Sequence, residues 1–170
     1  LSEEDLKKIV AEVVRNLGTA PDAPAASAAG GPVFDTVDQA VAAANAAQPG
    51  FQDLGLVARE KIIAAMREAS RQNARRWAEL AVAETGMGRV EDKVLKNQVC
   101  IDGTPGVEDL RAVSYTGDKG LTLVEYAPFG VVAAITPSTN AVATIISNAI
   151  GILSAGNAVG RIGNGRRLIL

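Results

Sequence analysis

Apolar side chains recur every three or four residues over positions 1–18 of the chain. This spacing places them on one side of a helix, so it predicts an amphipathic helix. Ser2 lies where it can cap the first turn, and Gly18 is a typical helix end. The apolar stripe consists of Leu6, Ile9, Val10, Val13, Val14 and Leu17.

Residues 19–32 follow with no large apolar side chain and many Ala, Pro and Gly residues. Such a segment cannot bury enough surface to offset its conformational entropy, which predicts a flexible linker. A helix that packs on its own domain seldom needs so long a featureless connection. We therefore favour a helix that binds a partner, with docking on its own domain as the alternative.

The helical period continues from Val33 for about seventy residues and predicts four helices. Their expected ranges are 37–47, 56–73, about 77–85 and 90–101. We expect Pro49 to end the first helix and Gly86 to end the third. In the fourth helix, the residues expected to face the core are Val90, Val94 and Leu95.

The period then changes to two, which predicts strands. Residues 113–126 read as a β-hairpin around the sequence TGDKG, and residues 130–136 read as a strand buried on both faces of a parallel sheet. A helix over about 139–155 and a strand from residue 157 complete one strand–helix–strand unit. This order is typical of an α/β fold that begins a Rossmann-type nucleotide domain.

The sequence therefore divides into four parts, which are residues 1–18, 19–32, 33–159 and 160–170. The last part reads GRIGNGRRLIL. Its glycine spacing fits neither a dinucleotide-binding fingerprint nor a P-loop, so an irregular terminus is expected. One strand–helix–strand unit cannot cover both faces of a parallel sheet, so the sheet is expected to be incomplete.

Composition narrows the functional classes. The net charge is −2 and aromatic residues make up 4% of the chain, so neither a basic patch nor a stacking surface indicates a nucleic-acid partner. The longest apolar stretch, residues 141–155, is interrupted by polar side chains and is too short to cross a membrane. With no secretory leader evident, a cytoplasmic protein is expected.

The chain has no histidine and one cysteine, Cys100. This excludes a Ser-His-Asp triad, a Cys-His pair and a histidine or thiolate metal cage within these residues. Cys100 lies near the end of a predicted helix with no neighbouring base. A packed structural cysteine is therefore favoured over a nucleophile.

The junction TPSTN, residues 136–140, is the strongest site candidate. Ligands of open α/β sheets bind beyond the carboxyl ends of strands, where a helix N-terminus offers free N–H groups. Ser138, Thr139 and Asn140 supply short polar side chains there. The alternative is that they only cap the following helix.

Four blocks follow one another in a familiar order: AETGMGRVEDKVLKN (83–97), GTPGVEDL (103–110), TGDKGLTLVEYAPFGVVAAITPSTN (116–140) and ISNAIGILSAGNAV (146–159). Together they resemble the CoA-acylating aldehyde dehydrogenases of bacterial microcompartments, of the propionaldehyde and acetaldehyde types. The resemblance covers residues 33–159. It implies an aldehyde dehydrogenase fold and the reaction aldehyde + CoA + NAD⁺ → acyl-CoA + NADH.

The resemblance also implies roles for individual residues. The hairpin 113–126 would be the oligomerisation element of a homo-oligomer. Asn140 would donate its side-chain amide to the oxyanion, with Thr139 as the alternative, and Ala141 stands where the family has proline. The residues that would line the nicotinamide side of the NAD site are Ile135, Thr136, Pro137, Ser138 and Thr139.

The helix 1–18 resembles an encapsulation peptide, which implies the microcompartment lumen as location. The residues that would contact a shell protein are Leu6, Ile9, Val10, Val13 and Leu17.

The sequence departs from the family after Val159, and Cys100 does not occupy the place of the catalytic cysteine. Truncation, an altered reading frame near Val159 and a designed chain all remain open. Three hypotheses follow: an inactive N-terminal part of the dehydrogenase, a non-enzymatic targeting or assembly module, and a small nucleotide-binding domain.

Overall fold

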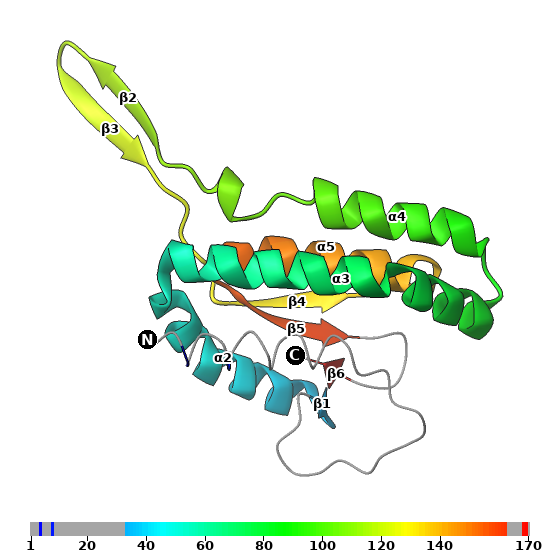
Figure 1. The fold of residues 1–170 in the computed structure, drawn as a ribbon. Coiled ribbons are helices and arrows are strands. Elements are labelled where there is room, and N and C mark those ends of the chain that lie inside the picture. Colours follow the sequence, from blue (N-terminus) through cyan, green and yellow to red (C-terminus); the bar gives the residue numbers. More distant parts are fainter. Residues whose placement is uncertain (1–3, 5–7, 9–32, 163–167, 170) are drawn as a thin grey trace.

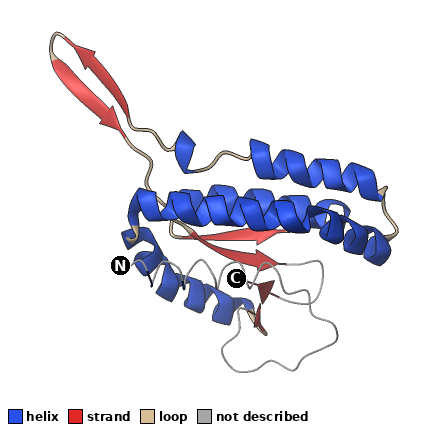
Figure 2. Cartoon of the chain, viewed as in Figure 1, coloured by secondary structure: helices blue, strands red, loops and turns tan. Residues whose placement is uncertain are grey.

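A computed structural model describes residues 33–162 and 168–169, together with Glu4 and Lys8, which are helical. Helix α2 lies on one side of a small sheet, and helices α3, α4 and α5 lie on the other (Figure 1). A two-stranded hairpin projects from one end, as the colouring by secondary structure makes clear (Figure 2). The helices are α2 (Val37–Asp53), α3 (Gly55–Thr85), α4 (Val90–Gly103) and α5 (Ala141–Ser154), with short 3-10 turns η1 (Val107–Asp109) and η2 (Ser138–Asn140). The strands are β1 (Val33–Phe34), β2 (Val113–Gly117), β3 (Gly120–Val124), β4 (Val131–Ile135), β5 (Ala158–Ile162) and β6 (Leu168–Ile169).

Helix α2 does not end at Pro49, as the sequence predicts, but continues to Asp53. Tertiary contacts outweigh the missing N–H of proline. The Gln48 side chain donates to the carbonyl of Gly156 at 3.0 Å, and Phe51 packs against the main apolar cluster. The start of the helix follows the prediction, because the Thr36 hydroxyl accepts from the backbone N–H of Gln39.

Helix α3 is one continuous helix of 31 residues, so the predicted interruption between Asn73 and Trp77 is wrong. No Gly or Pro separates the two predicted segments, and the Asn73 side chain donates to the carbonyl of Ala69 within the same helix. The predicted end at Gly86 is confirmed. Its φ of +66° is the left-handed conformation that glycine adopts most easily, and its N–H donates to the carbonyl of Val82.

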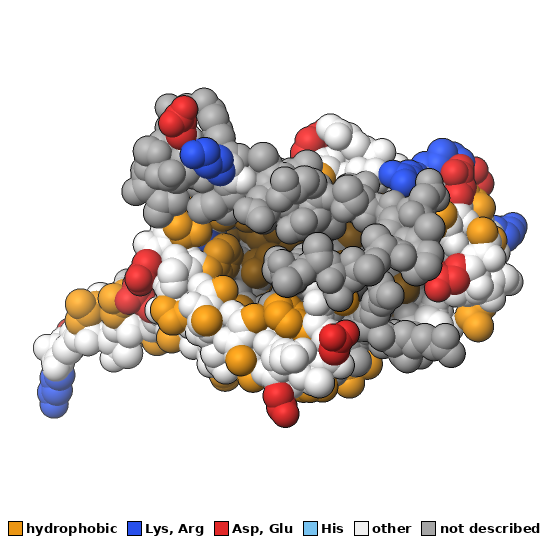
Figure 3. Space-filling model, turned by 90° about the horizontal axis from the view of Figure 1, so that it is seen from below, with side chains coloured by type: hydrophobic (Ala, Val, Ile, Leu, Met, Phe, Trp, Pro, Cys, Tyr) orange, Lys and Arg blue, Asp and Glu red, His pale blue; other side chains and the backbone are white. Residues whose placement is uncertain are grey.

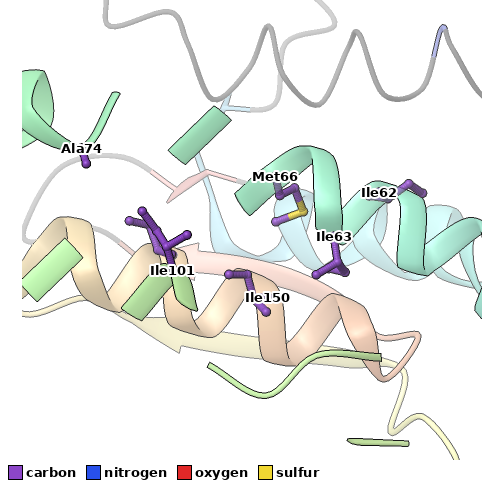
Figure 4. Packing of buried hydrophobic residues seen from close by; sticks show 7 residues of the cluster. Ile62, Ile63, Met66, Ala74, Ile101 and Ile150 are labelled. Carbon is purple, nitrogen blue, oxygen red and sulfur yellow. The ribbon is translucent and has the colours of Figure 1, made fainter. Parts of the chain in front are cut away.

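Of the three residues predicted to face the core in α4, Val90 and Val94 are half-buried on the same face as Asn97 and Ile101, and only the prediction for Leu95 is wrong. Leu95 is 62% exposed, whereas Asn97 and Ile101 are buried at 2% and 0%. Ile101 joins the central apolar cluster between α3, α4 and α5 (Figure 4). That cluster consists of Ile62, Ile63, Met66, Ala74, Ile101, Ile146 and Ile150.

The predicted strand–helix–strand unit is present as β4, α5 and β5. The two strands are parallel, with Val131 opposite Ala158 and Ile135 opposite Ile162. Burial of β4 on both faces is wrong for the described residues, because Ala134 is buried while Ile135 is 74% exposed. Successive side chains alternate between the faces, so the two faces of this strand are covered unequally at its carboxyl end.

Residues 160–170 are not uniformly irregular, which corrects the sequence prediction. Gly160 and Ile162 belong to β5, and β6 pairs antiparallel with it. Strand β1 then pairs with β6, so the sheet order is β1-β6-β5-β4. Strand pairing, which glycine spacing does not reveal, therefore sets the structure of residues 160–162 and 168–169.

The predicted hairpin is confirmed as β2 and β3, with Gly117 opposite Gly120 across the turn. Every one of its residues is exposed, among them Tyr115 at 64% and Leu121 at 69%. Both faces carry apolar side chains, since Val113 pairs with Val124 on one face and Ser114 with Leu123 on the other. A two-stranded hairpin of this kind is marginal alone in water.

The predicted helix 1–18, apart from Glu4 and Lys8, and the predicted linker 19–32 lie outside the described residues. On the α2 side of the molecule, hydrophobic side chains gather over the described surface (Figure 3). Val37 and Val41 of α2 are 53% and 42% exposed. None of the described helices combines the length and the hydropathy that a membrane crossing requires.

Candidate functional site

The TPSTN junction lies at the carboxyl edge of the parallel strand pair, as the sequence predicts. Strand β4 ends at Ile135, η2 covers Ser138–Asn140, and α5 begins at Ala141. The parallel register places the ends of β4 and β5 side by side. This is the edge where open α/β sheets bind ligands.

The side chains of the junction differ in exposure. Ile135 points outward, and Pro137 and Thr139 are exposed. Ser138 and Asn140 are half-buried. Thr136 is 6% exposed, and its hydroxyl has no hydrogen-bond partner among the described residues. A buried hydroxyl without a partner is uncommon, so another group is expected to satisfy it.

Asn140 occupies the N-cap position of α5 without capping it. Its side chain makes no hydrogen bond to the first turn of the helix, and its φ and ψ are −137° and 38°. The capping interpretation of this residue is therefore not supported. The positive end of the helix dipole lies at this point of the site.

Two lysines of α4 reach the junction from the side. Lys93 donates from Nζ to the backbone carbonyl of Thr139 at 3.1 Å. Lys96 donates from Nζ to the side-chain oxygen Oδ1 of Asn140 at 2.8 Å. Neither lysine was predicted from the sequence as a site residue, although both lie within the block ETGMGRVEDKVLKN.

Asn97 anchors this part of α4 to α3. Its side-chain Nδ2 donates to the carbonyl of Ala74 at 3.0 Å, and the residue is buried. Positions 93, 96 and 97 share one face of the helix, because residues three and four apart are neighbours. That spacing is the signal in the sequence that points to the two lysines.

A shallow hollow lies between α3, α4 and the start of α5. Its enclosed volume of about 10 Å³ is the space of about one water molecule. This hollow is far too small to hold a cofactor. The residues that line the hollow are Ala78, Ala81, Lys93, Lys96, Asn97, Asn140, Ala141, Val142 and Ala143.

Cys100 lies away from this junction in sequence and packs half-buried against the main apolar cluster. Its carbonyl accepts from both the N–H and the hydroxyl of Thr104 at the end of α4. These contacts agree with a packed structural residue. In the part of the chain that the structure describes, no group of three His, Cys, Asp or Glu side chains is arranged to hold a metal ion.

The sequence model of the aldehyde dehydrogenase family matches residues 26–160. The chain belongs to this family. It is 50% identical over 159 residues to the acetylating acetaldehyde dehydrogenase EutE of Escherichia coli K12, covering 94% of this chain and 33% of that protein. The chain therefore spans about a third of the length of that relative.

Solved structures agree with this family. A propionaldehyde dehydrogenase from the fucose utilisation bacterial microcompartment of Clostridium phytofermentans is 47% identical with a TM-score of 0.74. The match covers 78% of this chain and 31% of that chain. An engineered glycolyl-CoA reductase with bound NADP⁺ is 43% identical with a TM-score of 0.75, covering 82% and 32%. The expected resemblance to CoA-acylating aldehyde dehydrogenases and the expected fold are both confirmed.

Proposed function

We propose that this chain forms the N-terminal part of an NAD-dependent, CoA-acylating aldehyde dehydrogenase. The observation that carries the proposal is the Asn140 side chain at the carboxyl edge of the sheet, beside the uncapped start of α5. An amide donor at a helix N-terminus suits a developing oxyanion. The amide N–H groups and the helix dipole both place positive potential there, and neither has to reorient during the reaction. The family membership supports the same chemistry.

The junction residues offer the apolar and hydrogen-bonding groups that a nicotinamide ring would need. Ile135 offers an exposed apolar surface to a flat ring, and Thr136 has a hydroxyl without a partner among the described residues. When bound, the nicotinamide would accept hydride from the aldehyde carbon. The proposed wall of that site consists of Ile135, Thr136, Pro137, Ser138 and Thr139. Coenzyme A is the proposed second substrate, as acceptor of the acyl group.

The 170-residue chain alone is proposed to be inactive. Its one cysteine, Cys100, packs half-buried against the main apolar cluster. The acyl-transfer reaction needs a reactive thiolate near the oxyanion donor. We therefore expect no CoA-dependent NADH formation by the purified chain. Turnover that persists in Cys100→Ala, free of contaminating enzyme, would contradict this.

A chimera tests the role of Asn140. Residues 33–160 of this chain replace the matching segment of E. coli EutE, and NADH formation is followed with acetaldehyde and CoA. Asn140→Ala is expected to lower kcat by about 10²- to 10³-fold, the usual effect of removing one oxyanion donor. Thr139→Val is the matched control for the alternative assignment and is expected to lower kcat less than about tenfold. The reverse order of effects would move the role to Thr139.

A targeting role is the second candidate function. The apolar stripe of residues 1–18 and the microcompartment source of one structural relative support it. In this proposal the stripe binds a shell protein and takes the chain into a microcompartment lumen. Residues 1–18 fused to a fluorescent passenger should bring it into shells, and Leu6→Asp with Val13→Asp should prevent this. Unchanged localisation of the double variant would exclude the role.

A further inference from the structure

The hydrogen bond between Lys96 and Asn140 fixes which end of the asparagine amide faces the site. A lysine ammonium carries three donors and no acceptor. The Asn140 atom that lies 2.8 Å from Nζ of Lys96 must therefore be the oxygen Oδ1. The nitrogen Nδ2, with its two N–H donors, is then turned to the opposite side of the amide group.

The lysine lies next to the residue that anchors this part of α4 to α3. Asn97 is the next residue along α4, is buried, and is bonded to the backbone of α3. Lys93 lies one turn earlier and fixes the carbonyl of Thr139, the residue before Asn140. The turn η2 is thus attached to α4 at two successive residues, once through its backbone and once through a side chain.

We propose that Lys96 is a positioning residue that orients the Asn140 amide so that its Nδ2–H groups face the reacting oxygen. The catalytic meaning of this inference rests on the proposed function, in which Asn140 is the oxyanion donor. The charged donor on Oδ1 also polarises the amide, which strengthens the N–H groups as hydrogen-bond donors. Without Lys96, Asn140 has no described partner that distinguishes its two amide ends.

Nuclear magnetic resonance on the 170-residue chain tests the orientation directly, without enzyme activity. The probes are the Cγ and Nδ2H₂ resonances of the Asn140 side chain. In Lys96→Met, which keeps most of the aliphatic stem, both resonances should move towards the values of solvent-exposed asparagines, and the amide should become mobile. Lys96→Arg should restore most of the native shift, because guanidinium also donates to Oδ1.

Lys93→Met is the matched control, since it removes the neighbouring bond to Thr139 but leaves the Asn140 side chain untouched. It should shift the backbone signals of η2 and leave the Asn140 amide resonances near their native positions. Should Lys96→Met fail to fold, Asn140→Ala tests the same hydrogen bond from its other side. In that variant the ε-methylene group of Lys96 should become mobile, which its resonances report. Native Asn140 resonances in Lys96→Met, or unchanged Lys96 signals in Asn140→Ala, would overturn the proposal.

This outcome is independent of the chimera experiment. In that chimera, Lys96→Met is expected to lower kcat by about tenfold, within the range of coupled neighbouring residues, with KM for NAD⁺ little changed. It should have almost no further effect when Asn140 is already alanine. A full effect of Asn140→Ala with none for Lys96→Met overturns the positioning role alone. No effect of Asn140→Ala refutes the proposed function and leaves the orientation measurement intact.

Discussion

Ile101 and Asn97 illustrate at the residue scale how α4 is fixed in position. Ile101 is fully buried in the apolar cluster, while Asn97, one turn earlier, satisfies a backbone carbonyl of α3. Ile101 stabilises the packing of α4 through apolar burial, and the hydrogen bond of Asn97 fixes the rotation of α4 about its axis. The position of the two lysines at the candidate site depends on both.

Ile101→Ala should lower the free energy of unfolding by about 2–5 kcal/mol, because it leaves a cavity in the main cluster. Urea unfolding followed by circular dichroism measures the loss. Leu95→Ala is the matched control on the same helix, where the side chain is 62% exposed. Its effect should stay below about 1 kcal/mol. Equal losses in both variants would show that the described face of α4 is wrong.

Asn97→Ala should cost about 1–3 kcal/mol, because the carbonyl of Ala74 loses the buried side-chain donor that now satisfies it. Gln98→Ala, on the neighbouring exposed position, is the control. The same urea measurement applies. A neutral Asn97→Ala would mean that this anchor does not hold α4.

At the scale of secondary-structure elements, ion pairs connect α3 and α4. Both terminal nitrogens of Arg75 donate hydrogen bonds to the carboxylate of Glu91, at 2.9 and 3.0 Å. This hydrogen bonding lowers the pKa of Glu91 below its ordinary value, with the charge attraction of Arg75 as second cause. The pKa of Asp92 is lowered in the same direction, mainly by its hydrogen bonds from Arg89.

A carboxyl whose pKa is lower in the folded state stabilises the fold above its unfolded pKa and loses that contribution as the pH falls through the folded value. The melting temperature should therefore decline below about pH 5, and this pair should contribute only part of the decline because it is exposed. Arg75→Met should return the pKa of Glu91 towards normal, as followed by carboxyl resonances during a pH titration. An unchanged Glu91 titration would contradict the ion pair.

Arg67 connects three elements in a similar way, but it is more buried than the surface pairs. Its guanidinium donates to the carbonyls of Ile101 and Thr104, the second at 2.7 Å, and to the carboxylate of Glu108 in η1. Arg67→Met should cost about 1–3 kcal/mol, since two carbonyls lose their donor. Arg76→Met, on an exposed position of α3, is the control and should change stability by less than about 0.5 kcal/mol. Equal unfolding curves for the two variants would contradict this role.

Local sequence signals predicted the elements that local forces determine. The hairpin follows from its turn residues, the end of α3 from Gly86, and the strand–turn–helix junction from the apolar run 130–136 followed by the polar TPSTN cluster. The signals failed where distant contacts decide the outcome. Pro49 lies inside α2 because Gln48 and Phe51 contact other elements, and Leu95 of α4 is exposed because α3 and α5 pack on another side of that helix.

In the candidate site, too, some residues follow from local sequence signals and others depend on distant contacts. The junction and Asn140 were accessible from the sequence, because a polar cluster between a strand and a helix is a local pattern. Lys93 and Lys96 lie more than forty residues away from the junction and meet it only in the folded chain. Their helical spacing with Asn97 shows one shared face, but the sequence alone does not show what that face contacts.

At the scale of the whole molecule, the hairpin and Ile135 at the end of β4 leave large apolar side chains exposed. We propose that the hairpin joins copies of the chain into a homo-oligomer, since its apolar side chains are exposed on both faces. Leu121→Asp with Leu123→Asp should reduce the mass measured by light scattering after size exclusion. Thr122→Asp, between them on the opposite face, is the matched single-charge control. An unchanged mass in the double variant would exclude this interface.

We propose that residues 33–160 perform the task of the corresponding segment in a CoA-acylating aldehyde dehydrogenase. The most direct measurement is the steady-state rate of CoA-dependent NADH formation by the chimera with E. coli EutE, before any point substitution. We expect kcat within about tenfold of the parent enzyme, which corresponds to about 1.4 kcal/mol in the activation barrier. A folded chimera of parental mass that forms no NADH would contradict the claim.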